Sequence, residues 1–336
     1  MVSVQRLLDE GLFTASYKFA LLLALADLSI EHGDESGAAL SLATDDIAEK
    51  FVQYYWRQAV PYANATQSAI LQQNTDRQAA VVNMVADARV EYGNSLTAAM
   101  RDHKGWMRLV RKAAKVVRDM PLWRLQRIGS QQLDFLYEKQ GDGRVIQLRP
   151  GVAFCLRKFH ALISDLVRGA WMRYVRQQNL GILGETADLN EFLFGSERSN
   201  LAVVRPVLRD LQRGRCFYCR GAITGDAGHV DHFIAWARYP VDLAHNFVLA
   251  DERCNSKKRD RLPAYEHLAA WAERNAKYGA QIAGELEQRG LVAELVASKR
   301  VAQWAYGQTA AVKGLTWVRA DEMVPLEPGW RGLLSS

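Results

Sequence analysis

The hydrophobic pattern predicts a mostly helical chain up to residue 195. Apolar positions recur every three to four residues in most of this half, which is the spacing of a helix with one buried face. Residues 133–137 and 144–148 instead alternate across Gly141-Asp142-Gly143, so a β-hairpin is expected within 131–149. The predicted helices cover residues 4–13, 15–31, 44–56, 64–100 and 152–178.

A short extended piece, Leu40-Ser41-Leu42, lies between the second and third predicted helices. Two helices with such a piece are compatible with a winged-helix-like domain that recognises DNA. A plain helical bundle would have the same hydrophobic pattern. Both alternatives stay open at this point. We interpret residues 1–195 as a recognition or assembly region that ends in a glycine-containing linker, 181–195.

The pattern changes in the second half of the chain. Residues 229–234 and 245–250 are predicted strands, and the loop that joins them contains Pro240. Asp251 then stands where it can cap a following helix. Further helices are expected over 264–289 and 291–306, and the tail 317–336 can add a short strand. The predicted fold class is α+β and predominantly helical, with domains at 1–195, 196–275 and 276–336, the last a helical cap and tail.

Length and cysteine content narrow the class of protein. A chain of 336 residues can form two or three domains with separate cores. Four cysteines, of which Cys155 lies far from the others, do not make a disulfide framework, so we expect a cytoplasmic protein. The longest apolar run, Phe19–Ala26, is too short to span a membrane, so no membrane partner is expected.

The distribution of charge favours an anionic partner. The formal net charge is +6, and residues 101–127 are rich in Lys and Arg, with a helix break expected at Pro121. Helical spacing turns one basic face away from Leu109 and Val116, which is typical of a helix that contacts DNA phosphates, although a solvated basic face has the same pattern. A second basic stretch, 198–220, favours DNA contact over a solvated face. The residues of this face are Arg108, Arg111, Lys112 and Lys115.

Candidate chemistry is concentrated between Cys216 and Arg261. This segment holds a Cys-x-x-Cys pair, a third cysteine, an Asp-His pair on the first predicted strand, two asparagines and a basic cluster. A histidine can deprotonate water at neutral pH, and a carboxylate with an amide oxygen suits Mg²⁺ or Mn²⁺. Together these groups can hydrolyse a phosphodiester, whereas an isolated Asp-His pair would indicate a surface ion pair.

The order of these residues resembles the HNH endonuclease family, whose fold is the ββα-metal unit. The resemblance covers about residues 210–265 and is to the variant in which Asn replaces the final His. It implies that Asp231 and Asn255 hold a catalytic Mg²⁺ or Mn²⁺ and that His232 is the general base. It also implies that Asn246 is the catalytic asparagine of the motif.

The same resemblance implies a metal-dependent endonuclease that cuts double-stranded DNA. It is similar to stand-alone bacterial HNH proteins of restriction or anti-phage defence, in which case the N-terminal half binds the target, a partner protein or another copy of the chain. The alternatives are a nuclease directed at RNA and a non-cleaving nucleic-acid-binding module stapled by zinc. Further DNA contacts are expected from Lys257, Lys258 and Arg259.

The cysteines predict a second, structural metal site. Cys216, Cys219 and Cys254 supply three sulfurs, and tetrahedral zinc needs a fourth ligand. Zinc-bearing HNH proteins have another cysteine where this chain has Asp251. Reduced, buried thiols without a metal are an equally good interpretation. The candidates for the fourth ligand are Asp251, His229 and His245.

Overall fold

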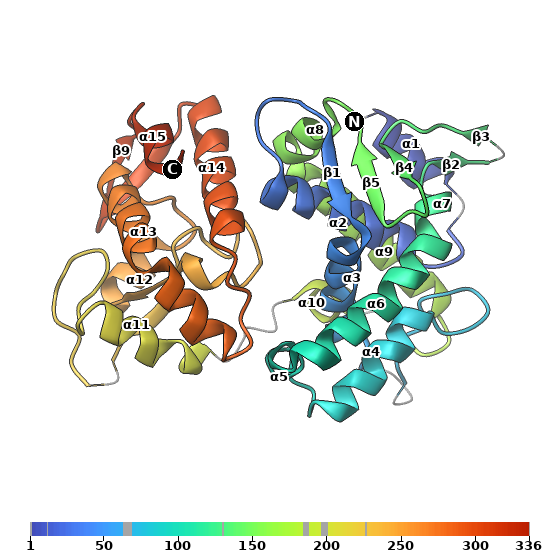
Figure 1. The fold of residues 1–336 in the computed structure, drawn as a ribbon, viewed down its shortest axis with the longest axis horizontal. Helices are drawn as coiled ribbons and strands as arrows, with labels where there is room; N and C mark the ends of the chain where they lie inside the picture. The colour runs from blue at the N-terminus through green and yellow to red at the C-terminus, as the bar shows by residue number, and fades with distance from the viewer. Residues whose placement is uncertain are drawn as a thin grey trace. The chain divides into compact units, whose positions relative to one another are not determined.

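The computed structural model describes residues 2–11, 13–62, 69–129, 131–183, 188–195, 201–225 and 227–335. The chain divides into two compact units, Met1–Glu197 and Arg198–Ser336. Figure 1 colours the first unit from blue to green and the second from yellow to red. The fold class is α+β and mostly helical, as the hydrophobic pattern predicted. The division lies two residues beyond the boundary expected after residue 195.

The first unit is built around one buried helix. Every residue of α2 from Tyr17 to Glu31 is buried, because this helix is apolar on nearly all sides and packs against α3, α8 and α9. The helices of this unit are α1 (Val2–Glu10), α2 (Tyr17–His32), α3 (Thr44–Gln58), α4 (Ala80–Glu91), α5 (Leu96–Arg101), α6 (His103–Asp119), α7 (Pro121–Arg124), α8 (Val152–Lys158), α9 (His160–Gln178) and α10 (Leu189–Phe194). Its strands are β1 (Leu40–Ala43), β2 (Arg127–Ile128), β3 (Gln131–Gln132), β4 (Tyr137–Gln140) and β5 (Val145–Leu148).

A three-stranded antiparallel sheet joins distant parts of this unit in the order β1-β5-β4. β1 lies between α2 and α3 in the sequence, whereas β4 and β5 form a hairpin after α6. α3 packs against α6. A strand from between two helices that pairs with a hairpin after a third helix is the connectivity of a winged helix. The sheet therefore excludes a plain helical bundle, although α4 and α5, which lie between α3 and α6, depart from the simple winged-helix order.

Three predicted elements of the first unit need correction. The expected helix 64–100 is two helices, α4 and α5, because Gly93 and Asn94 adopt left-handed backbone conformations between them. Residues 69–79 are not helical, and glutamine side chains there bond to the backbone, as Gln78 does to the N–H of Gln73. Residues 63–68 lie outside the described part of the chain.

The expected helix 152–178 is interrupted at Phe159, which separates α8 from α9. The expected linker 181–195 contains α10, whose Leu189 and Leu193 are buried. Main-chain carbonyls of α10 accept hydrogen bonds from Arg57 and Gln58 of α3, so this segment is part of the first unit. The helix end expected before Pro121 is confirmed, since α6 ends at Asp119.

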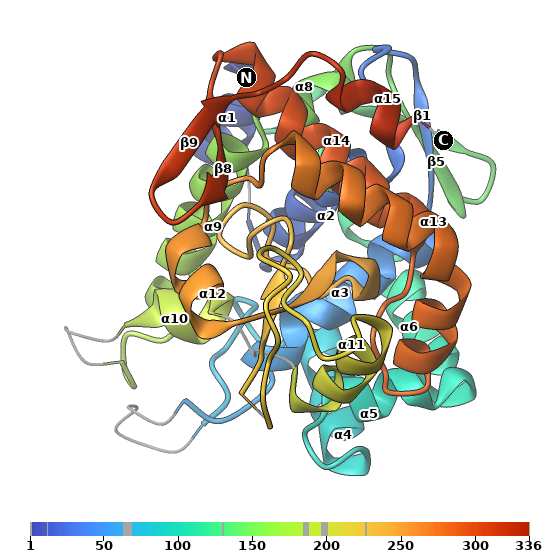
Figure 2. The same ribbon diagram turned by 90° about the vertical axis from the view of Figure 1, so that its left-hand side faces the viewer.

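The second unit contains a strand hairpin followed by helices. Its elements are η1 (Leu201–Val203), α11 (Arg205–Leu211), β6 (His229–His232), η2 (Ala244–Asn246), β7 (Phe247–Ala250), α12 (Glu252–Lys258), α13 (Tyr265–Glu287), α14 (Leu295–Ala311), β8 (Leu315–Arg319), β9 (Glu322–Pro325) and α15 (Trp330–Leu334). Figure 2 shows α13 and α14 packed side by side. The boundary expected between residues 275 and 276 falls inside α13, so the cap and the hairpin belong to one unit.

The hairpin is held by an aromatic core. The rings of Phe233 and Trp271 stack with centroids 5.2 Å apart, and Phe217 meets Phe233 edge-on at 5.9 Å. The Trp271 indole donates a hydrogen bond of 2.9 Å to the carbonyl of His245. α13 therefore fixes both ends of the loop between β6 and β7.

Among the described helices of the chain, none combines the length and apolar character that crossing a membrane requires.

Candidate functional site

The β6–β7 hairpin carries the Asp-His pair. The two strands are antiparallel, with Asp231 opposite Val248 and His232 opposite Phe247. Both strands are shorter than expected, because residues 233–234 leave the ladder and residues 244–246 form a 3₁₀ turn. Successive residues of a strand point to opposite faces, so the side chains of Asp231 and His232 diverge from one strand end.

Asn246 holds the loop between the strands closed. Its side-chain oxygen accepts a hydrogen bond of 2.7 Å from the N–H of Ile234, and its amide nitrogen donates one of 2.9 Å to the Ile234 carbonyl. Only 4% of Asn246 is exposed. The expected catalytic role is therefore replaced by a positioning role, in which Asn246 fixes the backbone that follows His232.

Asp231 lies in a polar cluster that joins three segments. Its Oδ2 atom accepts a hydrogen bond of 2.6 Å from the Tyr218 hydroxyl and lies 3.0 Å from the Lys258 ammonium. Lys258 also donates to the carbonyl of His232 at 2.7 Å. These bonds tie the Cys-x-x-Cys turn and α12 to β6.

The structure corrects the role expected for Lys258. Its side chain is fully buried and paired with Asp231, so it does not reach solvent to contact DNA. Burial lowers the pKa of the Lys258 ammonium, and the Asp231 carboxylate opposes that shift. Burial and the Asp231 charge both raise the pKa of Tyr218. Lys258 is a component of the Asp231 cluster rather than of the surface.

His232 has a carboxylate partner on the loop. Its Nε2 atom lies 2.7 Å from Oδ1 of Asp242, and 11% of its side chain is exposed. The ring meets Trp236 and Phe247 edge-on at centroid distances of 5.1 and 4.9 Å. A carboxylate that holds one ring nitrogen fixes the orientation of the imidazole, which is the usual arrangement for a histidine base.

Asn255 lies on α12, three residues before Lys258. It is partly buried, and its side chain makes no hydrogen bond with any residue of the described chain. Residues three apart share a helix face, so Asn255 is on the face of α12 that carries Lys258 and packs against β6. The described residues therefore leave its amide oxygen without a hydrogen-bond donor.

The structure brings Cys216, Cys219, Asp251 and Cys254 together as a group that could hold a metal ion. Their ligand atoms lie within 4.8 Å of one another. Four ligands of tetrahedral zinc are about 3.8 Å apart when each bond is about 2.3 Å long. His229 and His245 are not part of the cluster, and His245 instead bonds to the Gly279 carbonyl at 3.0 Å.

The local backbone explains this geometry. Cys216 and Cys219 lie on a tight turn that closes with a bond of 3.0 Å from the N–H of Arg220 to the Cys216 carbonyl, and Arg220 is left-handed, with φ of 62°. Asp251 caps α12 through a bond of 2.8 Å from the Cys254 N–H. Its other oxygen lies 3.0 Å from the Cys219 sulfur. Asp251 therefore combines the cap with a place in the cluster.

The electrostatics of this cluster depend on burial and on Asp251. Burial, followed by the bond to Asp251, raises the pKa of the Cys216 thiol to about 11, and the pKa of Cys254 is raised for the same reasons. Burial also acts to raise the pKa of Asp251, but hydrogen bonds from the thiols outweigh it and hold that pKa below its usual range. The carboxylate is thus the charged member of a group of thiols.

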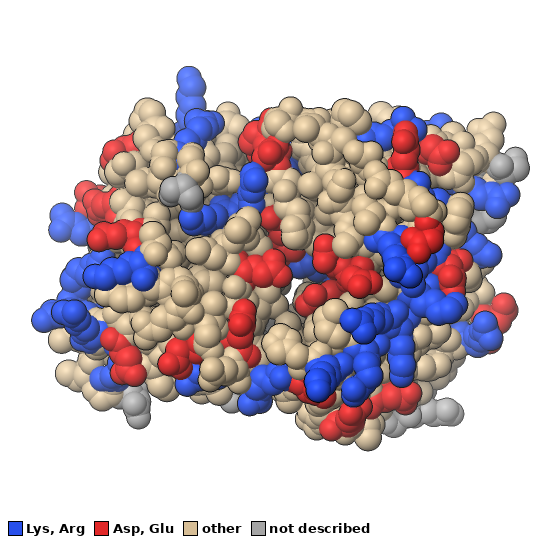
Figure 3. Space-filling view, in the orientation of Figure 1, with Lys and Arg blue, Asp and Glu red and all other residues tan. Residues whose placement is uncertain are grey.

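The basic face of α6 is exposed to solvent. Arg108, Arg111, Lys112 and Lys115 are exposed, while Leu109, Val110 and Val117 on the opposite side are buried. Figure 3 shows Lys and Arg side chains gathered over α6. Lys115 is paired with Asp119 on the same helix. In the second unit, Lys257 pairs with Asp321 at 2.9 Å, and Arg259 is exposed at the end of α12.

Comparison with known proteins identifies a family for the N-terminal part. The family described as a domain of unknown function, DUF8808, matches residues 3–187, which is more than half of the chain. The chain therefore belongs to this family. The match covers most of the first unit and none of the hairpin site. No curated protein and no solved structure matches the chain.

Sequence reasoning missed two residues of the site, Asp242 and Tyr218, and gave a third, Lys258, another role. Asp242 lies ten residues after His232 in a loop, and no spacing rule marks it. Tyr218 stands inside the Cys-x-x-Cys pair, where the cysteines drew attention instead. Lys258 was assigned to the surface because basic residues follow it. A polar residue amid buried neighbours is the signal that could have indicated them, and burial is visible only in the folded chain.

Proposed function

We propose that the second unit is a metal-dependent DNA endonuclease of HNH type. The observation that carries the proposal is that β6 carries Asp231 and the Asp242-paired His232, while α12, which packs against β6, carries Asn255. A hairpin followed by a helix, with these residues in this order, supports the ββα-metal fold. Restriction or anti-phage defence is proposed as the pathway from the resemblance alone.

His232 acts as the general base in this proposal. It takes a proton from the attacking water at Nδ1, while Asp242 holds the imidazole in position through Nε2. Its position at the end of β6, with part of the side chain exposed, is compatible with a phosphodiester approaching from solvent. The Trp236 and Phe247 rings limit the rotation of the imidazole.

Asp231 and Asn255 would hold the catalytic cation. A carboxylate and an amide oxygen fit Mg²⁺ or Mn²⁺, with water and phosphate oxygens as further ligands. When bound, the ion would neutralise charge on the phosphate and on the departing oxygen. Lys258 and Tyr218 both bond to Oδ2 of Asp231, which fixes the orientation of the carboxylate. Oδ1 would then be the oxygen that binds the cation.

The four-residue cluster is proposed as a structural zinc site. Three thiols and a carboxylate are a donor set that binds zinc. A zinc ion at this position would cross-link the Cys-x-x-Cys turn to the start of α12. Both segments support the Asp231 site, since Tyr218 lies on the turn and Lys258 on the helix. The zinc is therefore distinct from the catalytic Mg²⁺ or Mn²⁺.

Incubating the full chain with supercoiled plasmid and Mg²⁺ or Mn²⁺ tests the proposed function. We expect nicked and linear products, and none in the presence of EDTA. A matched RNA substrate decides between DNA and RNA, because preferential loss of the RNA would favour the RNA-directed alternative. Binding of DNA without cleavage under any of these ions would contradict the proposal and favour a non-cleaving module.

The catalytic metal ligands make a second prediction. Asp231→Asn should reduce cleavage by at least about 10–100-fold, whereas Asn255→His should keep part of it, because imidazole can replace the amide as a ligand. Asn is preferred to Ala at position 231 because it keeps a partner for the buried Lys258. Titrating Mn²⁺ against the initial cleavage rate measures both effects. Equal losses in the two variants would mean that Asn255 serves the structure rather than the metal.

The basic face of α6 is the proposed DNA-binding surface of the first unit. Changing Arg108, Arg111, Lys112 and Lys115 to Ala should flatten the slope of log affinity against log salt by roughly three to four units, since each phosphate contact contributes about −0.9. Fluorescence anisotropy with a labelled duplex at several salt concentrations measures this slope. An unchanged slope would reassign the face to a partner protein or a second copy of the chain.

A further inference from the structure

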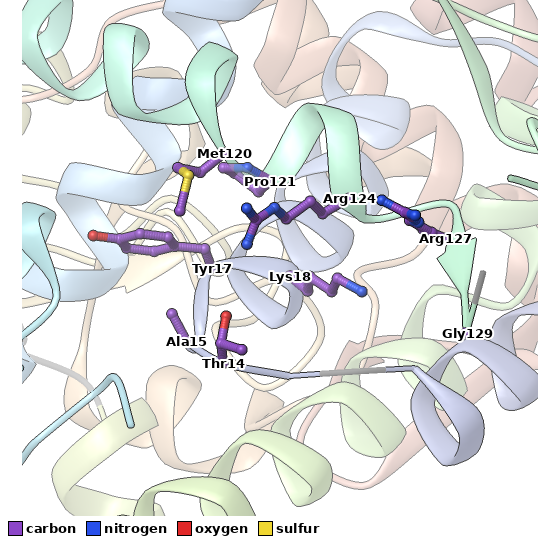
Figure 4. Close-up of a pocket in the computed structure, with 9 residues that line it drawn as sticks. All are labelled: Thr14, Ala15, Tyr17, Lys18, Met120, Pro121, Arg124, Arg127 and Gly129. Atoms are coloured by element: carbon purple, nitrogen blue, oxygen red, sulfur yellow. The ribbon is translucent and has the colours of Figure 1, made fainter. Parts of the chain in front are cut away.

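A pocket in the first unit has a basic lining, and none of its residues belongs to the hairpin site. Its volume is about 330 Å³, and it lies between the start of α2 and the segment that joins α6 to β2 (Figure 4). Lys18, Arg124 and Arg127 line it, and none of the described lining residues is acidic. This volume is near the lower end of the range for ligand pockets, about 300–1,000 Å³.

Lys18 is a buried cation that pairs with no carboxylate in the described part of the chain. Only 7% of it is exposed, and no carboxylate of the described residues lies within ion-pair distance of its ammonium. The ammonium lies 5.3 Å from the centre of the Phe13 ring. Burial, and then the charges of Arg124 and Arg127, lower the pKa of Lys18 to about 8. A buried charge normally has a counter-ion, so this group lacks the anion that would stabilise it.

The surroundings of Lys18 suit a phosphate group. The pocket meets the first turn of α2, a helix of 16 residues, and the first N–H groups of a helix lack partners within it and attract anions. Arginine forks bind phosphate oxygens two at a time, whereas lysine acts as a point charge. Of the three cations that line the pocket, Arg124 and Arg127 are exposed and Lys18 is buried.

One wall of the pocket is apolar. It consists of the Tyr17 ring together with Met120 and Pro121 (Figure 4). The Tyr17 hydroxyl accepts a hydrogen bond of 3.1 Å from the N–H of Val81, which fixes the ring. An organic group attached to the phosphate can pack against this wall.

We propose that this pocket binds the phosphate group of a small phosphorylated molecule, held by Lys18, Arg124 and Arg127. The volume limits the attached organic group to about the size of a sugar or a single nucleoside. The site lies within the part of the chain that the DUF8808 family covers, so the proposal does not depend on nuclease activity.

Calorimetry and thermal melting of the full chain test this site. The probes are inorganic phosphate, ribose 5-phosphate and AMP, with adenosine and sodium chloride at matched ionic strength as controls. We expect the phosphorylated probes to bind and to raise Tm, and adenosine to do neither. Tighter binding of ribose 5-phosphate or AMP than of phosphate indicates an organic phosphate as the ligand, and equal binding indicates free phosphate.

Lys18→Met should lower the affinity for AMP at least tenfold. Met keeps the length of the side chain and removes the buried charge, so the variant should fold. Lys104→Met, at an exposed lysine of α6 outside the pocket, should bind as the wild type does. The double variant Arg124→Met/Arg127→Met tests the same site through exposed residues. Affinity unchanged in Lys18→Met and in the double variant would overturn the proposal.

Proton uptake gives an independent readout. An anion beside Lys18 favours its charged form, so binding at pH 8 should take up about half a proton per AMP, measured by calorimetry in two buffers of different ionisation enthalpy. Lys18→Met should abolish this uptake. Binding of AMP without proton uptake by the wild type, or a rise in Tm that sodium chloride reproduces, would also contradict the site.

Discussion

Replacing His232 by Ala is expected to lower the rate of plasmid cleavage by about 10²–10⁴-fold while DNA binding persists. The reason is that the ring acts on the attacking water, whereas the contacts that bind DNA lie elsewhere. Single-turnover cleavage of supercoiled plasmid in Mg²⁺, with the affinity for an uncut duplex measured in Ca²⁺, separates the two quantities. Wild-type cleavage by this variant would contradict the assignment of the base.

His229 offers a matched control for this experiment. It is a histidine of the same strand, β6, but it is exposed and has no part in the Asp231 cluster. His229→Ala should therefore cleave at close to the wild-type rate. A comparable loss in both variants would mean that β6 tolerates no truncation, and the result for His232 would then carry no information about catalysis.

Asp242→Asn refines the same prediction. The amide oxygen can still accept a hydrogen bond from the ring, but the negative charge that favours the imidazolium after proton transfer is lost. The expected loss of rate is smaller than in His232→Ala, with unchanged affinity for DNA. Wild-type rates would mean that the 2.7 Å contact between His232 and Asp242 serves the packing of the loop alone.

The local order of the site could be predicted from the sequence. The two strands, the helix that follows and the cap at Asp251 depend on residues a few positions apart, for which alternation and capping rules are strong. The meeting of the three cysteines was also predicted, with Asp251 as one of three candidates for the fourth ligand, and the structure brings Asp251 to the turn that holds Cys216. These features need little knowledge of distant parts of the chain.

The roles of Lys258, Asn246 and Asp242 could not be predicted in the same way. Lys258 is buried because β6 packs against α12. The side chain of Asn246 hydrogen-bonds to the backbone of Ile234, twelve residues earlier. Each role depends on tertiary packing that neither composition nor periodicity expresses. The helix break at Gly93 and Asn94 is a related case, since a helical pattern of apolar residues runs across it.

Zinc removal is expected to destabilise the second unit more than any single substitution at its surface. Protein purified without added metal should contain about one zinc per chain, since three thiols and Asp251 lie within reach of one ion. A strong chelator should lower Tm of this unit, because the free energy of zinc binding adds to the free energy of unfolding. The stabilisation should weaken as the pH falls, because the thiols must lose their protons to bind zinc.

Single substitutions can distinguish zinc from a cluster of buried thiols. Cys216→Ser should lower both the zinc content and Tm, whereas Cys155→Ser, at an exposed cysteine of α8, should change neither. Asp251→Cys should raise the affinity for zinc by supplying a fourth sulfur, at a cost of about 1 kcal/mol for the lost helix cap. Elemental analysis and melting with and without chelator measure these effects. Zinc-free protein whose melting does not respond to chelation would show that the thiols pack without a metal. In that case the Cys-x-x-Cys turn would be held to α12 by the Asp251 hydrogen bonds, and the Asp231 site would depend on those bonds instead.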